Sequence, residues 1–320
     1  MKPKILLASL ACALALASTV RAEQSGTGHY ISGSTASFID AFPGQPGFGF
    51  ENIFFYWNNA NVGASHGLPL EGGIALNVNA SVYADTSLAY YQAPIDILGG
   101  NPVFAVAIPY VWAEVTAGSV RDRRSGPPIT RTTSDTADGV GDIEMWPFWL
   151  GWTNGDFKYD VRTAVYAPSG EYNKTALANV GLGYWTFEPE IVFSWLSTKI
   201  GTEVSLFTGL DFNTKNTDAD YQSGDIFHVD ATVAQHLPLL GGFAGVGANG
   251  FYYKQFTGDS GSGAKLGAFE TESYGVGPVG SYVHQMGKSQ LVFEVKWLPQ
   301  MHVENTFKGN FVWAKLVFVF

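Results

Sequence analysis

Hydrophobic and polar positions alternate with a period of two along much of the chain. In the stretch 157–167, "FKYDVRTAVYA", the odd positions are mainly apolar or aromatic, while Lys158, Asp160 and Arg162 occupy even positions. The stretch 291–297, "LVFEVKW", repeats this alternation. Because successive side chains of a β-strand point to opposite faces, the pattern predicts strands with one apolar and one polar or mixed face.

The alternation predicts about 12 strands, many of them longer than the usual five or six residues. The predicted strands span 49–58, 73–91, 101–119, 140–152, 156–168, 184–196, 201–213, 225–237, 242–255, 272–285, 289–300 and 309–320. Tight connections such as "TNGD" alternate with long polar ones such as "RDRRSGPPITRTTSDTAD". One end of the sheet should therefore carry short turns and the other end large loops.

Two classes of β-protein show this alternation, and they differ in which face meets water. A soluble secreted sandwich buries its apolar face, whereas an outer-membrane barrel turns that face to lipid and keeps polar residues inside. Long strands, an even strand number, alternating loop lengths and aromatic residues near strand ends (Trp57, Trp152, Trp195 and Trp297) favour the barrel. We therefore predict an all-β fold, a transmembrane antiparallel up-and-down barrel over residues 49–320.

The first 22 residues, "MKPKILLASLACALALASTVRA", predict a secretory signal peptide. Lys2 and Lys4 precede an apolar run that ends on a Val20-Arg21-Ala22 cleavage site. The run is shorter than the roughly 20 apolar residues of a spanning helix. The chain's one cysteine, Cys12, lies inside this segment. Together with the barrel, the segment predicts export to a bacterial outer membrane.

Residues 23–48 are rich in Gly, Pro and Ser and lack the strand period. These roughly 25 residues form no domain of their own, and a segment of this length without secondary structure usually has a function. We predict that this periplasmic or plug-like segment folds into the mouth or lumen of the barrel.

The last strand, which ends in "WAKLVFVF", finishes on an aromatic residue. Its proposed assembly signal is Leu316, Phe318 and Phe320, an apolar face similar to the terminal pattern read by the barrel assembly machinery. We expect this strand to close the barrel against 50–57. Its inward face is largely apolar, which suits packing against the N-terminal segment.

The net charge and the charge of the predicted lumen face restrict which molecules the protein can bind. The 320 residues are 46% hydrophobic and 14% charged, with a net charge of −10, which argues against nucleic-acid binding. The polar face predicted to line the lumen is mostly acidic and disfavours anions. Aromatic patches on it suit neutral aromatic compounds, although ordinary packing of a narrow barrel explains them equally well. The candidate permeation residues are Tyr83, Tyr110, Trp112, Asp160, Arg162, Glu188, Glu190, Glu203, Phe207, His228, Asp230, Phe251, Tyr253, Glu294 and Lys296.

Candidate catalytic and metal motifs are weak. "GDSGSG" at 258–263 lacks a histidine context for a serine nucleophile, and "GVGANG" at 245–250 precedes no helix. His228, Asp230 and His236 share one strand face and predict a lumen hydrogen-bond network in preference to a bound metal or a catalytic pair. We therefore predict no enzymatic activity, no metal and no cofactor.

Four stretches resemble one known family. "GTGHYISGSTASFIDAFPGQPGF", "GVGDIEMWPFWLGW", "YAPSGEYN" and "LANVGLGYWTFEP" occur in the order found in the meta-pathway of phenol degradation family. The resemblance implies an outer-membrane β-barrel that acts as a channel for hydrophobic or aromatic small molecules. It implies no catalytic residues.

The resulting functional hypothesis is passive uptake of small hydrophobic or aromatic compounds. The expected partners are outer-membrane lipid, the barrel assembly machinery and the permeant itself. Three alternatives stay open: a closed structural or adhesive barrel without transport, a barrel enzyme acting on lipid, and a soluble secreted sandwich that binds a ligand.

Overall fold

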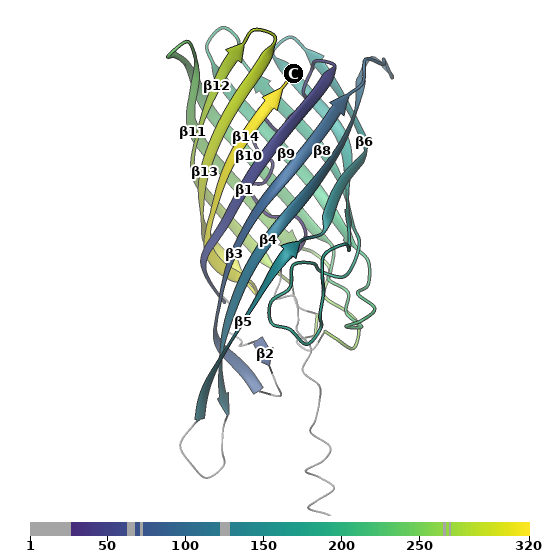
Figure 1. The fold of residues 1–320 in the computed structure, drawn as a ribbon, viewed down its shortest axis with the longest axis vertical. Helices are drawn as coiled ribbons and strands as arrows, with labels where there is room; N and C mark the ends of the chain where they lie inside the picture. Colours follow the sequence, from purple (N-terminus) through teal and green to yellow (C-terminus); the bar gives the residue numbers. More distant parts are fainter. Residues whose placement is uncertain (1–26, 63–67, 71–72, 122–128, 265–266, 269) are drawn as a thin grey trace, which may run out of the picture.

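The computed structural model describes residues 27–320 except 63–67, 71–72, 122–128, 265–266 and 269 (Figure 1). The predicted signal peptide therefore lies outside the described residues. Among the described residues, no helix is long and apolar enough to cross a membrane. The strands are β1 (Gly47–Val62), β2 (Leu68–Leu70), β3 (Gly73–Gln92), β4 (Asn101–Arg121), β5 (Ile129–Val140), β6 (Ile143–Asn154), β7 (Phe157–Ala167), β8 (Thr186–Leu196), β9 (Thr202–Asn213), β10 (Ile226–Leu239), β11 (Gly242–Gln255), β12 (Glu272–Met286), β13 (Ser289–Glu304) and β14 (Phe307–Val319).

Antiparallel pairing closes the sheet into a 12-stranded barrel. Strand β1 pairs with β14 on one side and with β3 on the other, while β3 also pairs with β4. From β6 to β14 each strand pairs with its sequence neighbour. The predicted closing contact is present, since Phe50 lies opposite Phe318 and Trp57 opposite Phe311. The predicted all-β barrel is therefore confirmed, and closure leaves its twelve strands without open edges.

Two strands stand outside the closed ring. Strand β5 pairs only with the distal part of β4, and the three-residue β2 pairs only with β3. The predicted polar loop over 121–138 is wrong from residue 129 onward, because these residues belong to β5. Pairing with β4 satisfies its backbone despite a Thr- and Asp-rich sequence, and the two strands extend beyond the barrel wall (Figure 1).

The two ends of the barrel differ as the loop lengths predict. The C-terminus lies at the end with the short hairpins, such as the turn between Asn154 and Phe157 (Figure 1). The long connections, including 168–185 and 214–225, lie at the opposite end.

Apolar side chains cover the outer surface of the barrel and charged groups lie inside it. Along β8, exposed and buried residues alternate, so that Ile191 is 63% exposed while Glu188 and Glu190 are buried. Other outward residues include Phe54, Ile108, Phe148, Leu206, Val233, Phe293, Trp297 and Leu316. This inverts the pattern of a soluble protein and matches a barrel with an outward apolar band.

One predicted girdle residue lies on the wrong side. Trp57 is buried and shares the inward face of β1 with Glu51 and Phe55, because all three positions are odd. Trp297 is exposed on the outer face. A position near a strand end therefore does not show whether an aromatic residue faces lipid. That depends on whether its position is one of the inward or the outward positions of the alternating strand.

Arginine at the centre of the outer face should destabilise the protein more than arginine near its edge. Val233 lies midway along β10 and Leu237 near its end, both outward. We expect Val233→Arg to reduce the free energy of unfolding in lipid vesicles by about 2–4 kcal/mol, and Leu237→Arg by about 0–1 kcal/mol. Urea titration, with folded protein quantified by the mobility of unheated gel samples, measures both. Equal costs would contradict a lipid-facing outer surface.

Candidate functional site

The N-terminal segment, defined here as residues 27–46, lies inside the barrel. Tyr30, Ala36 and Phe42 are almost fully buried, and each stands on a stretch without regular secondary structure. An irregular backbone enclosed by a barrel needs hydrogen-bond partners for its polar groups. The lumen side chains supply them at several points.

The first anchor joins the middle of the segment to the closing strand β14. The Asp40 carboxylate accepts backbone hydrogen bonds from Ala36 (2.8 Å) and Ser37 (3.1 Å) and pairs with the buried ammonium of Lys315. The same ammonium donates to the Ser34 carbonyl. The Arg162 guanidinium of β7 donates to the Asp40 carbonyl at 3.0 Å.

The electrostatics of Asp40 keep this anchor charged. Burial opposes ionisation of its carboxyl, but the positive charges of Lys315 and Lys296, together with the hydrogen bonds from Lys315 and the Ala36 amide, outweigh that penalty. The pKa of Asp40 consequently falls from 3.8 to about 2. The carboxylate is therefore ionised at neutral pH.

The second anchor joins Tyr30 and Gly33 to β10. The Tyr30 hydroxyl donates to Asp230, and the Gly33 amide donates to the other oxygen of that carboxylate at 2.9 Å. The Tyr30 ring also stacks on His228, with centroids 3.6 Å apart.

Further contacts fix both ends of the segment. Nδ1 of His29 lies 2.7 Å from the Thr186 hydroxyl, and its Nε2 lies 2.9 Å from Asp142. Amides of the segment also donate to lumen carboxylates, from Phe38 to Glu203 (2.7 Å) and from Phe42 to Asp160 (3.2 Å). Four lumen carboxylates, those of Asp142, Asp160, Glu203 and Asp230, thus bind the segment.

A cavity of about 440 Å³ lies between the segment and the opposite wall of the barrel. That wall comes from β1, β3, β4 and β6, where mainly small or apolar side chains point inward, together with the carboxylates of Glu51 and Glu144. They include Ile53, Phe55, Val82, Ala84, Leu88, Val111, Ala113, Val115 and Trp146. Most carboxylates that bind the segment come from β7 to β10, so the lumen has an apolar half and a charged half.

Most of the candidate permeation residues lie in the lumen. The structure places on its inner face Asp160, Arg162, Glu188, Glu190, Glu203, Phe207, His228, Asp230, Phe251, Tyr253, Glu294 and Lys296, all of them buried. They form local pairs, such as Arg162 with Glu190 and Lys296 with Glu294, rather than one continuous row.

Three aromatic candidates are wrong. Tyr83, Tyr110 and Trp112 are 38–43% exposed on the outer face, because the alternate positions of β3 and β4 face the cavity. Both faces of β4 are largely apolar, and the outward face of β3 carries Asn79, Asp85 and Ser87, so the alternation alone does not show which face is inside. Sequence reasoning missed the inward residues Ala84 and Ala113. Their small side chains are the sequence signal for the inner face here, because they leave space for a cavity in a lumen that is otherwise filled by side chains.

The predicted hydrogen-bond network of His228, Asp230 and His236 divides into separate contacts. His236 binds Glu203 at 2.8 Å, Asp230 binds the N-terminal segment, and His228 lies 2.9 Å from Glu188. Their common strand face was predicted correctly. Their partners come from other strands and from the segment.

Hydroxyl, imidazole and carboxylate groups meet at Thr186, His29 and Asp142, as in a hydrolase triad. Thr186 is completely buried, however, and its hydroxyl donates to Asn213 at 2.6 Å. Because that proton is directed to Asn213 and away from the imidazole, the arrangement serves as a structural clamp.

Comparison with known proteins agrees with this architecture. Residues 58–316 match the family described as "MetA-pathway of phenol degradation". The chain belongs to this family. Among solved structures, this phenol-degradation family barrel is similar to the COG4313 outer membrane channel from Pseudomonas putida F1, with 12% identity and a TM-score of 0.59. The match covers 91% of this chain and 100% of that chain, so the fold is that of an outer-membrane channel.

Other similarities are weaker. The beta domain of the Bordetella autotransporter BrkA matches with 10% identity and a TM-score of 0.45, covering 86% of this chain and 100% of that one. The transport unit of the Escherichia coli autotransporter AIDA-I matches with 11% identity and a TM-score of 0.39, covering 87% and 91%. No curated protein matches the phenol-degradation family barrel.

Removing the Asp40 charge should loosen the N-terminal segment. Asp40→Asn leaves the buried Lys315 ammonium without its partner, and breaking such a pair costs about 3–5 kcal/mol. In a Ser37→Cys background we expect maleimide to label the buried position more than tenfold faster after Asp40→Asn. Asp85→Asn, which changes an outward carboxylate, is the control. Unchanged labelling would show that the pair does not hold the segment.

The stabilising contribution of the Asp40 anchor depends on pH. Because the pKa of Asp40 is lowered from 3.8 to about 2, its contribution to stability is present above about pH 4 and is lost as the pH falls through 2. The Trp313 indole donates to the Ser32 carbonyl at 3.2 Å, so tryptophan fluorescence reports on this region. We expect a fluorescence change near pH 2 that is absent from Asp40→Asn. A midpoint near pH 4 in the wild type would contradict the anchor.

Proposed function

We propose that this barrel is a channel for passive uptake of small hydrophobic or aromatic compounds across the outer membrane. The observation that carries the proposal is the 440 Å³ cavity with its apolar wall. A dry apolar cavity of about 150 Å³ is enough to bind benzene, so the volume suits compounds of one or two rings.

The distribution of charge supports a neutral permeant. Arg162, Glu188 and Glu190 border the cavity on the side where they are paired with other groups, and Glu51 and Glu144 border it from β1 and β6, so the uncharged part of the wall is that of β3 and β4. An ion that crossed the apolar half would lose its hydration without gaining a partner, which costs several kcal/mol. A neutral aromatic compound avoids that cost.

The N-terminal segment supplies the gate in this proposal. It occupies the lumen and contacts both the charged half and the cavity. A permeant would enter among the long loops, move along the apolar wall and leave after a local shift of the segment. Its anchors to β10 and β14 would limit that shift to part of the segment.

The setting of the protein is part of the same proposal. We infer export through cleavage of residues 1–22, followed by insertion into outer-membrane lipid by the barrel assembly machinery acting on Leu316, Phe318 and Phe320. Leu316 and Phe320 are exposed on the finished barrel, as an apolar terminal signal facing lipid requires. The family name and the related solved structure, an outer membrane channel, support this setting.

Filling the cavity should block uptake. Ala113 is buried in the apolar wall on β4, and Val106 faces outward on the same strand. We expect Ala113→Trp to reduce uptake of labelled toluene or phenol by cells about tenfold, equal to about 1.4 kcal/mol on the barrier. Val106→Trp should leave uptake unchanged. Outer-membrane amounts and heat-modifiable gel mobility establish that each variant is folded.

The same assay distinguishes the competing functions. Uptake that is equal with and without the gene would overturn the channel proposal and favour a closed structural barrel. If uptake depends on the gene but is unchanged by Ala113→Trp, the permeant takes another route through the lumen.

A further inference from the structure

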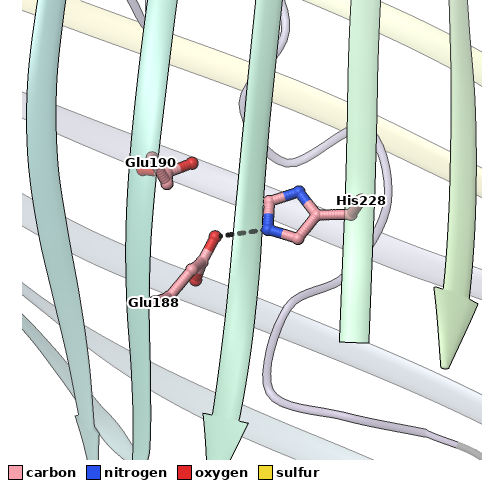
Figure 2. A group of neighbouring side chains, drawn as sticks. All are labelled: Glu188, Glu190 and His228. Carbon is pink, nitrogen blue, oxygen red and sulfur yellow. Dashed lines mark ion pairs between the residues drawn. The ribbon is translucent and has the colours of Figure 1, made fainter. Parts of the chain in front are cut away.

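We propose that Glu188, Glu190, His228 and Asp211 form a binding site for a divalent cation of the Zn²⁺ type inside the barrel. Figure 2 shows two glutamate side chains of β8 and the His228 imidazole of β10 converging across the strand between them. One ligand atom from each of these three residues lies within 4.8 Å of the other two. Glu188 and Glu190 also border the cavity described above, but metal binding does not require that the cavity conduct a permeant.

The backbone of β9 makes this convergence possible. Gly209 is the direct pairing partner of both His228 and Glu190, so it stands between them. A Cβ atom at position 209 would lie 2.4 Å from His228 Nε2 and 3.1 Å from the Glu190 Cγ. Only glycine leaves the space in which the imidazole and the carboxylates meet.

Each glutamate keeps an oxygen for the centre of the site. The Tyr166 hydroxyl donates to Oε2 of Glu188 at 2.8 Å, and the Arg162 Nε donates to Oε2 of Glu190 at 2.5 Å. Oε1 of Glu188 is directed at His228 Nε2, 2.9 Å away, and Oε1 of Glu190 is not the oxygen that Arg162 binds. Hydrogen bonds that orient the outer oxygen of a ligand carboxylate are typical of metal sites.

Asp211 supplies a second, independent observation. It is fully buried, and within the part of the chain that the structure describes neither of its carboxylate oxygens accepts a hydrogen bond. Its Oδ1 lies 3.5 Å from His228 Nε2, on the side where the glutamates converge. A buried carboxylate without hydrogen bonds is costly unless a cation neutralises it.

The imidazole is also poised to ligate. Nε2 of His228 lies 2.9 Å from Oε1 of Glu188, but among the described residues neither ring nitrogen makes a hydrogen bond of ordinary geometry. Stacking on Tyr30 holds the ring plane. A neutral imidazole would present the Nε2 lone pair to the same point as the carboxylate oxygens.

The charge balance favours a divalent ion. Glu188, Glu190 and Asp211 bring three carboxylates, while the nearby cation Arg162 is shared between Glu190 and Asp160, and a protonated His228 would offset only one negative charge. One imidazole with two or three carboxylates is a usual ligand set for Zn²⁺ and similar first-row ions. Ca²⁺ and Mg²⁺ prefer oxygen ligands alone. The ion would lock the ring on which Tyr30 stacks and so strengthen the seat of the N-terminal segment.

Metal binding to the full exported protein, purified without an affinity tag and stripped with a chelator, tests the proposal. After equilibrium dialysis against Zn²⁺, mass spectrometry of the bound metal should give one ion per barrel. Co²⁺ should give the visible absorption of a four- or five-coordinate ion. Glu188→Gln and His228→Gln should weaken binding by more than the roughly 10–100-fold typical of changes outside the ligand shell.

His236→Gln is the matched control. His236 is also a buried histidine, lies on the same face of β10 as His228, and in the described structure pairs with one carboxylate, that of Glu203. This variant should bind Zn²⁺ as the wild type does. The proposal is overturned if wild-type protein retains no stoichiometric ion, or if the ligand variants bind as tightly as the wild type. Should a ligand variant fail to fold, the wild-type stoichiometry and the Co²⁺ spectrum decide the outcome.

Discussion

Buried charges inside this barrel need partners, and the N-terminal segment provides many of them. Carboxylates of Asp160, Glu203 and Asp230 accept hydrogen bonds from its backbone, and Lys315 pairs with its Asp40. Without the segment, these groups would need water or one another. The segment is therefore part of the folded interior, although it belongs to no strand.

This requirement divides the lumen. Where the segment binds, the inner face carries acids, Arg162 and Lys315; across the cavity, β3 and β4 carry alanine and valine. A uniformly charged interior would hold water and favour ions, and a uniformly apolar one would leave the segment without hydrogen-bond partners. The two halves together allow a barrel whose lumen holds the N-terminal segment to keep a largely apolar cavity.

The limits of sequence reasoning follow from the same division. On β7 to β10 the alternation of polar and apolar residues shows which face is inside, and Arg162, Glu188 and Asp230 were placed correctly. On β4 both faces are largely apolar, and on β3 the outward face is the more polar one, so Trp112 and Tyr83 were assigned to the wrong face. Strand β5 was missed because its Thr- and Asp-rich sequence resembles a loop, and only pairing with β4 makes it a strand.

The period of two, the loop lengths and the aromatic C-terminal strand are properties of neighbouring residues, so the sequence alone determined the barrel, its approximate strand number and its closing pair. The meeting of Asp40 with Lys315, or of His228 with Glu188 across Gly209, joins residues that are far apart in the chain. Such contacts depend on strand register and on the path of the irregular N-terminal segment. Only the tertiary structure decided them, because a period of two says which way a side chain points and not which side chain it meets.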